Sequence, residues 1–389
     1  MTSRVLTIIG TRPEAIKLAP VIKRIQNCPS GLESVVCVTA QHREMLDQVL
    51  GLFEITPDYD LNLMSEGQTL HSLTASVITS VTSVLEKTRP GMVLVQGDTT
   101  TAMVSALASF YEQVPVGHVE AGLRTDNRYN PFPEEINRRL ISELATLHFA
   151  PTQTAVSALL RAGISADTIF LTGNSVVDAL LFMVKNLRPT DLKLPLRGDK
   201  LILVTAHRRE NFGRPIQNIC LALRKLATDH ADLDIVYPVH LNPSIQEPVY
   251  RLLANRPGIH LVPPLDYMTF VSLMAKCYIV LSDSGGIQEE APALGKPVLV
   301  LRTTTERPEA IQAGTAKLVG VETEAIVEQA EVLLGDQMEY RRMATAISPY
   351  GDGHAAERIV DAIRVHFEPL SCFGVRNKGM LTNADLTGL

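Results

Sequence analysis

Residues 278–301 read YIVLSDSGGIQEEAPALGKPVLVL and contain a complete strand, loop, helix and strand. The stretch opens with apolar residues typical of a buried parallel strand and stops at Asp283. It then passes through a Ser-Gly-Gly turn into a short helix, and a second buried strand begins at Pro297. This order is the repeating unit of a parallel α/β sheet.

The glycine turn in this stretch suggests an anion site. Gly285 and Gly286 allow backbone N–H groups and a helix N-terminus to point at one spot beyond the strand, which binds phosphate without side-chain charge. Glu289 and Glu290 follow, and a carboxylate beside a diphosphate can accept ribose hydroxyls. The pattern therefore indicates either a nucleotide-sugar site or an ordinary helix whose acidic first turn complements its dipole.

The composition indicates a globular protein of two domains. The chain has 389 residues, 46% of them hydrophobic and 20% charged, with no low-complexity tract. A net charge of -6 provides no basic face for nucleic acid, and no apolar run approaches the roughly 18 residues that span a bilayer. The N-terminal VLTIIG lacks a signal-peptide cleavage pattern, and the five scattered cysteines lack metal-binding spacing. We therefore expect a cytoplasmic protein with buried free thiols and no nucleic-acid or membrane partner.

Strand and helix patterns alternate through both halves of the chain. Strand-like runs at 4–9, 34–39, 92–96 and 114–119 are each followed by helical patterns or polar loops, and a second series begins with LILVTAH at 201–207. A polar segment with two prolines, NLRPTDLKLPLRGDK, joins the two series. We predict an α/β protein of two doubly wound, Rossmann-like domains facing a cleft, which is the default ligand site. Because no GxGxxG follows a strand, we do not expect a nicotinamide cofactor.

Charged residues follow the early strands. Arg12 and Lys17 lie at or near a helix start, where cations oppose the helix dipole and suggest contact with a diphosphate. Asp98 follows the strand at 92–96, either as the cap of the next helix or as a functional group. Glu120 ends a buried strand and caps nothing evident, so its charge requires a partner or a function.

Later polar groups follow the same rule. Glu134 and Glu135 begin a helix after a proline, where complementing the helix dipole is the alternative to a functional role. His207 ends the strand LILVTAH beside two arginines and a glutamate, and a strand-end histidine can be structural or functional. His240 occupies the corresponding place after the strand IVYPVH.

Together these motifs resemble one known family. The motifs are GTRPEAIKLAP, QHREMLDQ, QGDTTT, HVEAGLRT, PFPEEINRR, GNSVVDAL, TAHRREN, YPVHLNP and DSGGIQEEAPALGKPVLVLR with TTERPEA. In this order, over residues 1 to about 365, the chain resembles the bacterial non-hydrolysing UDP-N-acetylglucosamine 2-epimerases. The resemblance implies a glycosyltransferase-B-type architecture. It implies an N-terminal domain at 1–172 with a returning helix at about 352–370, and a UDP-binding domain at 173–351. Residues 371–389 lie outside the resemblance, and their polar, glycine-containing composition predicts a flexible tail.

The resemblance also implies a reaction. Family members interconvert UDP-N-acetylglucosamine and UDP-N-acetylmannosamine by eliminating UDP to a glycal-type intermediate and adding it back, with the C2 proton returned to the other face. Such a path requires acid/base groups on both faces of C2 and a firm hold on the departing UDP. The family resemblance implies a homodimer without metal or nicotinamide that supplies N-acetylmannosamine units for cell-surface polysaccharide such as capsule.

Residue roles carry over by motif. The implied catalytic residues are Asp98, Glu120, Glu134 and His207. The implied substrate-binding residues are Arg12, Lys17, Arg138, Phe270, Ser284, Gly285, Gly286, Glu290 and Arg307. A second UDP-N-acetylglucosamine acts as an allosteric activator in bacterial members, and the matching positions are Gln41, His42 and His240.

Three alternatives remain at this point. A hydrolysing 2-epimerase on the same fold would release UDP and free N-acetylmannosamine, whereas a glycosyltransferase would need an acceptor site in the first domain. A non-catalytic sensor of nucleotide sugars would have no need of the three carboxylates. The intact QHRE and HLNP motifs favour the non-hydrolysing epimerase.

Overall fold

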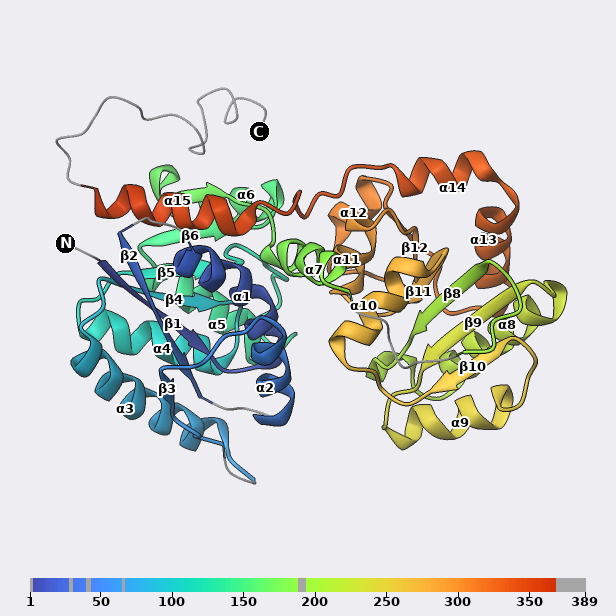
Figure 1. Ribbon diagram of the computed structural model, residues 1–389, viewed down its shortest axis with the longest axis horizontal. Coiled ribbons are helices and arrows are strands. Elements are labelled where there is room, and N and C mark those ends of the chain that lie inside the picture. Colours follow the sequence, from blue (N-terminus) through green and yellow to red (C-terminus); the bar gives the residue numbers. More distant parts are fainter. Residues whose placement is uncertain (1–2, 28–30, 40–42, 65–66, 188–193, 369–389) are drawn as a thin grey trace. The chain divides into compact units, whose positions relative to one another are not determined.

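The computed structural model describes residues 3–27, 31–39, 43–64, 67–187 and 194–368, and it divides into two units. Unit 1 comprises Met1–Ala179 and Tyr350–Leu389, and unit 2 comprises Leu180–Pro349. Each unit has its own parallel sheet with helices packed against it (Figure 1).

Within the described residues, the sheet of unit 1 has seven parallel strands in the order β3-β2-β1-β4-β5-β6-β7. The strands are β1 (Ser3–Ile9), β2 (Leu32–Val38), β3 (Tyr59–Asp60), β4 (Met92–Gln96), β5 (Val116–Val119), β6 (Leu147–Ala150) and β7 (Ile169–Leu171). The helices are α1 (Arg12–Asn27), α2 (Arg43–Leu52), α3 (Leu70–Thr88), α4 (Thr100–Tyr111), α5 (Glu134–Leu144), α6 (Gln153–Arg161), η1 (Ala166–Thr168), α7 (Ser175–Lys185) and α15 (Ala355–Phe367). The last residues of α7 belong to unit 2.

Unit 2, in the part of the chain that the structure describes, has six parallel strands in the order β10-β9-β8-β11-β12-β13. The strands are β8 (Lys200–Thr205), β9 (Leu233–Pro238), β10 (Ile259–Val262), β11 (Ile279–Ser282), β12 (Val298–Val300) and β13 (Ala316–Leu318). The helices are η2 (Arg209–Asn211), α8 (Arg214–Asp229), α9 (Pro243–Leu253), α10 (Tyr267–Lys276), α11 (Ile287–Ala293), α12 (Pro308–Gln312), α13 (Thr323–Gly335) and α14 (Gln337–Ala344).

Hydrophobic patterning explains these elements. All five residues of β4 are buried, because a parallel strand is covered by helices on both faces and reads as a continuous apolar run. On α1, Ile16, Ala19, Ile22 and Ile25 recur at helical spacing, and all four are buried. Cys37, Cys220 and Cys277 are buried free thiols, which confirms that expectation for the cysteines that the structure describes.

The strand order has one reversal in each sheet. Chain order turns back between β1 and β4 in unit 1 and between β8 and β11 in unit 2, as in a Rossmann fold. Ligands of such sheets bind beyond the carboxyl ends of the strands at this reversal. The predicted α/β class with two Rossmann-like domains is therefore confirmed.

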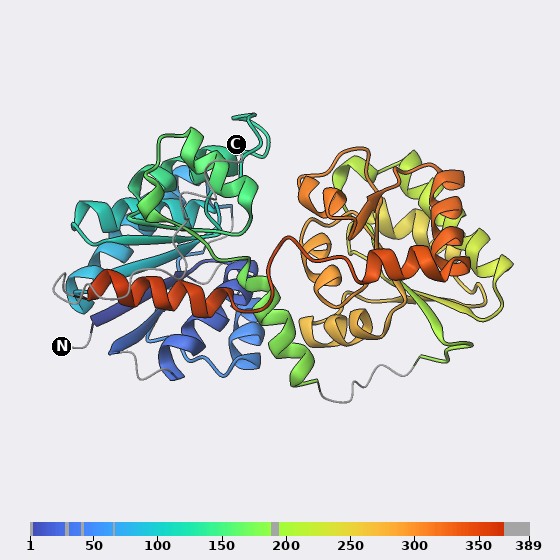
Figure 2. The ribbon, with the colours of Figure 1, turned by 90° about the horizontal axis from the view of Figure 1, so that it is seen from above.

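Helix α15 completes unit 1 from the far end of the chain, and it lies along that unit in both ribbon views (Figures 1 and 2). Asp178 accepts the backbone N–H groups of Ala355 at 3.2 Å and Ala356 at 2.8 Å, and thereby satisfies two donors at the start of α15. Arg24 of α1 pairs with Glu357 at 2.8 Å. Unit 1 is thus built from two separate parts of the sequence.

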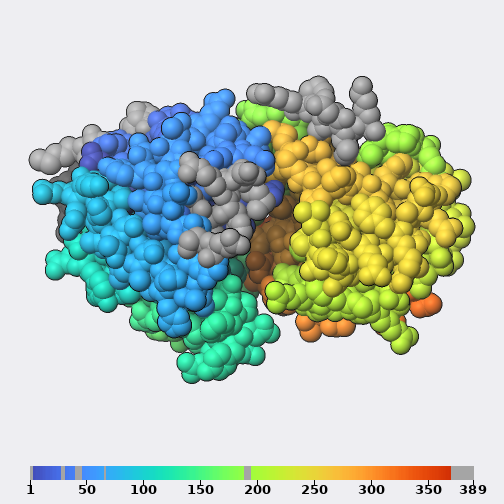
Figure 3. Space-filling view, turned by 90° about the horizontal axis from the view of Figure 1, so that it is seen from below, coloured from blue at the N-terminus to red at the C-terminus, as the bar shows by residue number. Residues whose placement is uncertain are grey.

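The view from below shows α3 of unit 1 in blue and α9 of unit 2 in yellow at the molecular surface (Figure 3). Both helices cover their sheets with an apolar side, which on α3 includes the buried Val77 and Val81. In the described part of the chain, none of the helices combines the length and the hydropathy that crossing a membrane requires.

Candidate active site

Glu120 follows β5 directly, and its carboxylate is bonded by three side chains of unit 1. Lys17 Nζ lies 2.6 and 2.7 Å from its two oxygens, and Asn174 Nδ2 donates to Oε1 at 2.8 Å. Gln96 also donates to Oε2. The Glu120 backbone has a φ of 65°, a left-handed conformation that is costly for a residue with a side chain. Glu120 lies at the strand end where it was predicted, and Lys17 is a partner of the kind that its charge required.

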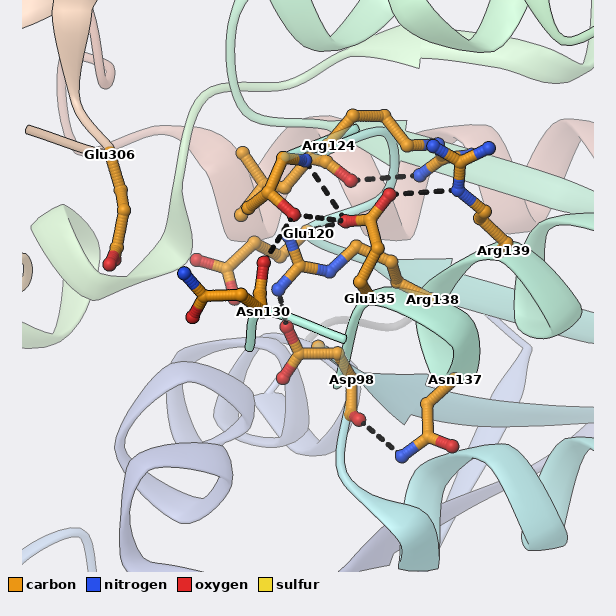
Figure 4. Close-up of polar contacts among 12 residues, drawn as sticks. Asp98, Glu120, Arg124, Asn130, Glu135, Asn137, Arg138, Arg139 and Glu306 are labelled. Carbon is orange, nitrogen blue, oxygen red and sulfur yellow. Dashed lines mark hydrogen bonds and ion pairs between the residues drawn. The ribbon is translucent and has the colours of Figure 1, made fainter. Parts of the chain in front are cut away.

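Asp98 lies in the same group of charges. Its Oδ2 is 2.5 Å from Arg138 Nη2, and Asn137 Nδ2 donates to its backbone oxygen at 2.9 Å (Figure 4). Burial raises the pKa of Asp98, whereas Arg138 opposes that rise. Glu120 and Lys17 also act on this pKa, in opposite directions, so the two carboxylates and two cations form one electrostatic cluster.

The helix cap beside Asp98 is a different residue. Thr99 is the N-cap of α4, and its side chain accepts from the N–H of Ala102 at 3.0 Å. The interpretation of Asp98 as the cap is therefore wrong, because the chain enters α4 one residue later. The Asp98 carboxylate is thus not used in starting the helix.

Glu134 and Glu135 begin α5 and have opposite surroundings. Glu135 is fully buried, accepts the Thr125 N–H at 2.9 Å and is bonded to Arg139 Nε at 2.8 Å. Burial alone would raise the pKa of Glu135, but these hydrogen bonds outweigh it and leave the pKa below its usual value. Glu134 Oε2 is buried and has no hydrogen-bond partner among the described residues. Glu135 therefore holds a loop in place, whereas Glu134 retains an uncommitted carboxylate oxygen.

Glu14 joins two turns of unit 1 and was not identified from the sequence. It accepts the N–H of Gly10 at 3.0 Å, the N–H of Thr11 at 2.5 Å and the hydroxyl of Thr99 at 2.8 Å. These bonds tie the turn after β1 to the turn after β4, on either side of the strand reversal. The signal was present in GTRPEA, where a glutamate follows the turn within a helical turn. The side chain of Arg12, next to this turn, makes no hydrogen bond or ion pair with the described part of the chain.

In unit 2, His207 follows β8, and its ring stacks on that of His240, with centroids 5.5 Å apart and planes at 12°. The structure thus joins a predicted catalytic residue and a predicted activator-site residue. Burial lowers the pKa of His207, the Asp283 carboxylate opposes this, and His240 and Arg208 reinforce it. Gln41 and His42, the other predicted activator residues, lie outside the described residues.

The turn from Ser284 to Gly286 presents bare backbone at the start of α11. Gly286 has a φ of -63°, so its conformation does not require glycine. A Cβ would meet its nearest atom at 3.7 Å on Gly285 and at 3.9 Å on Gly286, both ordinary contact distances. Within the described residues, the N–H groups of the two glycines donate to no protein acceptor. A methyl group would therefore fit at either glycine without displacing a protein atom.

The remaining predicted residues of unit 2 lie on α10, on α11 and just before α12. Glu290 is buried, and Tyr267 donates its hydroxyl to Oε1 at 2.8 Å. Arg307 forms an ion pair with Glu289, the residue before Glu290. Phe270 lies half-buried on α10, the helix that also carries Tyr267.

An enzyme that acts on nucleotide sugars needs a site for the diphosphate and groups that transfer protons. The glycine turn of one Rossmann-like unit and the cluster of carboxylates and cations in the other are suited to these two tasks. The family model described as UDP-N-acetylglucosamine 2-epimerase matches residues 23–364. The chain belongs to the UDP-N-acetylglucosamine 2-epimerase family, as its motifs indicated.

Relatives of this family match the chain over nearly its full length. The UDP-N-acetylglucosamine 2-epimerase of Escherichia coli (strain K12) is 52% identical over 370 residues, which cover 93% of this chain and 98% of the relative. The crystal structure of the Neisseria meningitidis UDP-GlcNAc 2-epimerase bound to UDP-GlcNAc has 52% identity and a TM-score of 0.83, and the match covers 92% of this chain and 99% of that one. A Staphylococcus aureus protein solved with UDP has 48% identity and a TM-score of 0.84, covering 96% and 100%.

Proposed function

We propose that this chain is a non-hydrolysing epimerase that interconverts UDP-N-acetylglucosamine and UDP-N-acetylmannosamine. The observation that carries the proposal is the cluster of Lys17, Asp98, Glu120 and Arg138 at the strand ends of unit 1. Family membership supplies the substrate class, and the cluster supplies the acid/base groups that inversion at C2 requires.

The C2 hydrogen of the sugar is not acidic, because no carbonyl group adjoins C2. Breaking the bond between C1 and the UDP oxygen creates positive charge at C1 and makes the C2 proton removable. A carboxylate takes this proton, C1 and C2 become doubly bonded, and UDP leaves with the bonding electrons. In the return step a proton is delivered to the other face of C2 while UDP adds to C1, so the product is the C2 epimer.

In this proposal Asp98, Glu120 and Glu134 serve as the acid/base groups. The raised pKa of Asp98 suits a group that must both hold and release a proton near neutral pH. Lys17 and Arg138 keep the neighbouring charges compensated, and Arg12 adds a cation for the departing diphosphate.

Unit 2 would hold the nucleotide part of the same substrate. The glycine N–H groups and the start of α11 bind the diphosphate, and Glu290 binds the ribose hydroxyls. Phe270 packs near the uracil, Arg307 contacts the substrate, and His207 assists at the developing charge. Retaining UDP in this way is what separates reversible epimerisation from hydrolysis.

Proton NMR of UDP-N-acetylglucosamine incubated with the enzyme in heavy water tests the proposal. We expect deuterium at C2 of both nucleotide sugars, accumulating UDP-N-acetylmannosamine, and little free UDP. Free N-acetylmannosamine with an equal amount of UDP would establish the hydrolysing reaction instead. No exchange at C2, even with added substrate as activator, would favour a glycosyltransferase or a sensor.

We propose further that the enzyme is a cytoplasmic homodimer that needs no metal or nicotinamide, supplies cell-surface polysaccharide synthesis, and is activated by a second UDP-N-acetylglucosamine. The stacking of His240 on His207 supports activation, because a ligand held by His240 would act on the neighbouring ring. Light scattering tests whether the protein is a dimer, and turnover after EDTA treatment tests whether it needs a metal ion. Reverse-reaction rates with and without traces of UDP-N-acetylglucosamine test activation.

A further inference from the structure

A buried aspartate beyond β11 holds the loop that carries His207. Asp283 is completely buried, and its Oδ2 accepts the N–H of His207 at 2.7 Å and the N–H of Arg208 at 2.8 Å. Asn211 Nδ2 donates to the same oxygen at 2.9 Å. Because β8 and β11 are neighbouring strands, these bonds fix the loop after one strand to the end of the other.

The other oxygen of Asp283, Oδ1, lacks the hydrogen bonds that Oδ2 has. Oδ1 is buried without a hydrogen-bond partner among the described residues, and His207 Nδ1 lies 3.5 Å from it. A buried carboxylate oxygen that lacks a donor is costly, and a small rotation of the imidazole would bring Nδ1–H within hydrogen-bond distance. Only the imidazole form that carries a proton on Nδ1 can satisfy this oxygen.

One face of the His207 ring packs against another ring, and part of the side chain is exposed to solvent. His240 stacks on it, while 41% of the His207 side chain remains exposed. Nε2 makes no hydrogen bond to any part of the chain that the structure describes. A proton fixed on Nδ1 leaves the Nε2 lone pair as the group that the ring presents to a ligand.

We propose that Asp283 is a positioning residue for His207, which accepts Nδ1–H and thereby fixes both the ring orientation and the nitrogen that faces the substrate. The inference rests on the proposed function only for the part that His207 plays in turnover. The tautomer itself is a property of the unliganded protein and is measured separately.

Unit 2 contains a matched control at the opposite end of its sheet. Asp234 is also completely buried, and it pairs with His260 Nε2 at 2.8 Å. It also accepts the backbone N–H groups of Arg197 at 2.5 Å and Gly198 at 3.2 Å. Asp234 lies near the start of β9, whereas ligands of parallel sheets bind at the strands' carboxyl ends. The same bonding pattern is therefore structural in one place and, as we propose, functional in the other.

Asp283→Asn provides the test. The amide oxygen can take the place of Oδ2 and keep all three donors, whereas the amide NH2 takes the place of Oδ1 and donates to Nδ1. His207 must then carry its proton on Nε2. We expect kcat to fall at least about a hundredfold with KM changed less than about threefold, because orientation rather than binding is lost. Asp234→Asn should keep turnover within about threefold of the wild type.

Nitrogen-15 NMR of histidine-labelled protein at about pH 8, where imidazole is neutral, gives the readout that does not depend on activity. The His207 signal is assigned by its loss in His207→Gln. We expect the Nδ1–H form in the wild type and the Nε2–H form in Asp283→Asn. An Nε2–H form in the wild type would overturn the inference, even if Asp283→Asn failed to fold.

The kinetic outcomes are equally decisive. Full turnover in Asp283→Asn, or an equal loss in Asp234→Asn, would overturn the inference, because the carboxylate would then have no specific role. If the wild type does not exchange the C2 proton, the proposed function fails, while an Nδ1–H form of His207 would still establish the pairing with Asp283.

Discussion

The two units place their candidate residues at the same edge of similarly wound sheets, but they equip that edge differently. Unit 1 uses charged side chains in contact with one another, such as Lys17 with Glu120 and Arg138 with Asp98. Unit 2 uses the backbone of the glycine turn, together with a buried aspartate that arranges a loop. The strand reversal thus determines where a ligand binds, whereas the residues that follow the strands determine what can be done to it.

This difference has a physical basis. Proton transfer, the role that we propose for unit 1, requires groups that change charge, and the cations beside the carboxylates of unit 1 offset the cost of burying them. Holding a diphosphate requires fixed N–H dipoles that do not change during the reaction, and bare backbone supplies them. Substitutions in unit 1 should therefore act mainly on turnover, and substitutions at the turn of unit 2 mainly on binding.

The largest effect should come from Glu120→Gln in unit 1. We expect turnover to fall at least about a hundredfold, because an amide cannot exchange a proton as a carboxylate does. Losing the ion pair with Lys17 should also lower the free energy of unfolding, and Lys17→Met in the same chain should restore part of that stability but not the turnover.

Epimerisation rates measured by NMR give the change in turnover, and urea titrations give the change in the free energy of unfolding. Glu33→Gln is the control. This exposed carboxylate pairs with Arg4 at 3.1 Å near the starts of β1 and β2, whereas Glu120 follows the end of β5. Near-normal turnover in folded Glu120→Gln would remove Glu120 from the catalytic group.

Two adjacent glutamates should respond in opposite ways. Glu134→Gln should lower turnover about a hundredfold and leave stability nearly unchanged, because its Oε2 has no hydrogen-bond partner among the described residues. Glu135→Gln should lower the free energy of unfolding by about 1–3 kcal/mol, because the buried carboxylate is bonded to Arg139 and Thr125. Kinetics and urea titrations of both variants would refute this separation if the two residues lost turnover and stability equally.

In unit 2, Gly286→Ala should affect binding more than stability. The methyl group meets no atom closer than 3.9 Å, so the free energy of unfolding should stay within about 1 kcal/mol of the wild type. The same methyl group occupies space beside the backbone N–H groups, and we expect UDP affinity to fall at least about tenfold. Calorimetric titration with UDP measures this, and Gly335→Ala on α13 is the control. Unchanged affinity would place the diphosphate elsewhere.

The smallest effect concerns Asp352, which lies before α15 and is in neither candidate group. Its hydrogen bond with Arg358 lowers the pKa of Asp352 to about 2. A lowered carboxylate pKa stabilises the fold above the unfolded value of about 3.9 and loses that contribution as the pH falls through about 2. Because the pair is largely exposed, Asp352→Asn should cost less than about 1 kcal/mol at neutral pH.

Urea titrations from neutral pH downward should show the difference between Asp352→Asn and the wild type shrinking below about pH 4. A difference that stays constant with pH would mean that the pair does not act through charge.

Local patterns predicted the fold well because each element is set by neighbouring residues. The run MVLVQ was expected as a strand at 92–96, and β4 is Met92–Gln96. The strand, turn and helix around Asp283 also form as expected, although β11 ends one residue earlier. Periodicity and glycine position carry this information along the chain itself.

The site was harder to predict from the sequence, because its contacts join residues that are far apart in the chain. Glu120 and Lys17 are separated by 103 positions, and Asn174 by another 54, so only the folded sheet reveals their bonds. Glu134 and Glu135 could not be separated either, since successive helix positions point about 100° apart and the sequence does not say which direction is buried. Asp98 was interpreted as a possible cap because capping depends on the backbone of one residue, which here is Thr99.

The return of α15 to unit 1 also sets an order of events during synthesis. A ribosome delivers the chain from its N-terminus, so all of Leu180–Pro349 has been made before Ala355 and Ala356 exist to bond with Asp178. Until then unit 1 lacks its last helix, and the surface of α1 that α15 contacts has no cover from that helix. The half that begins first in the gene is therefore the half that finishes last.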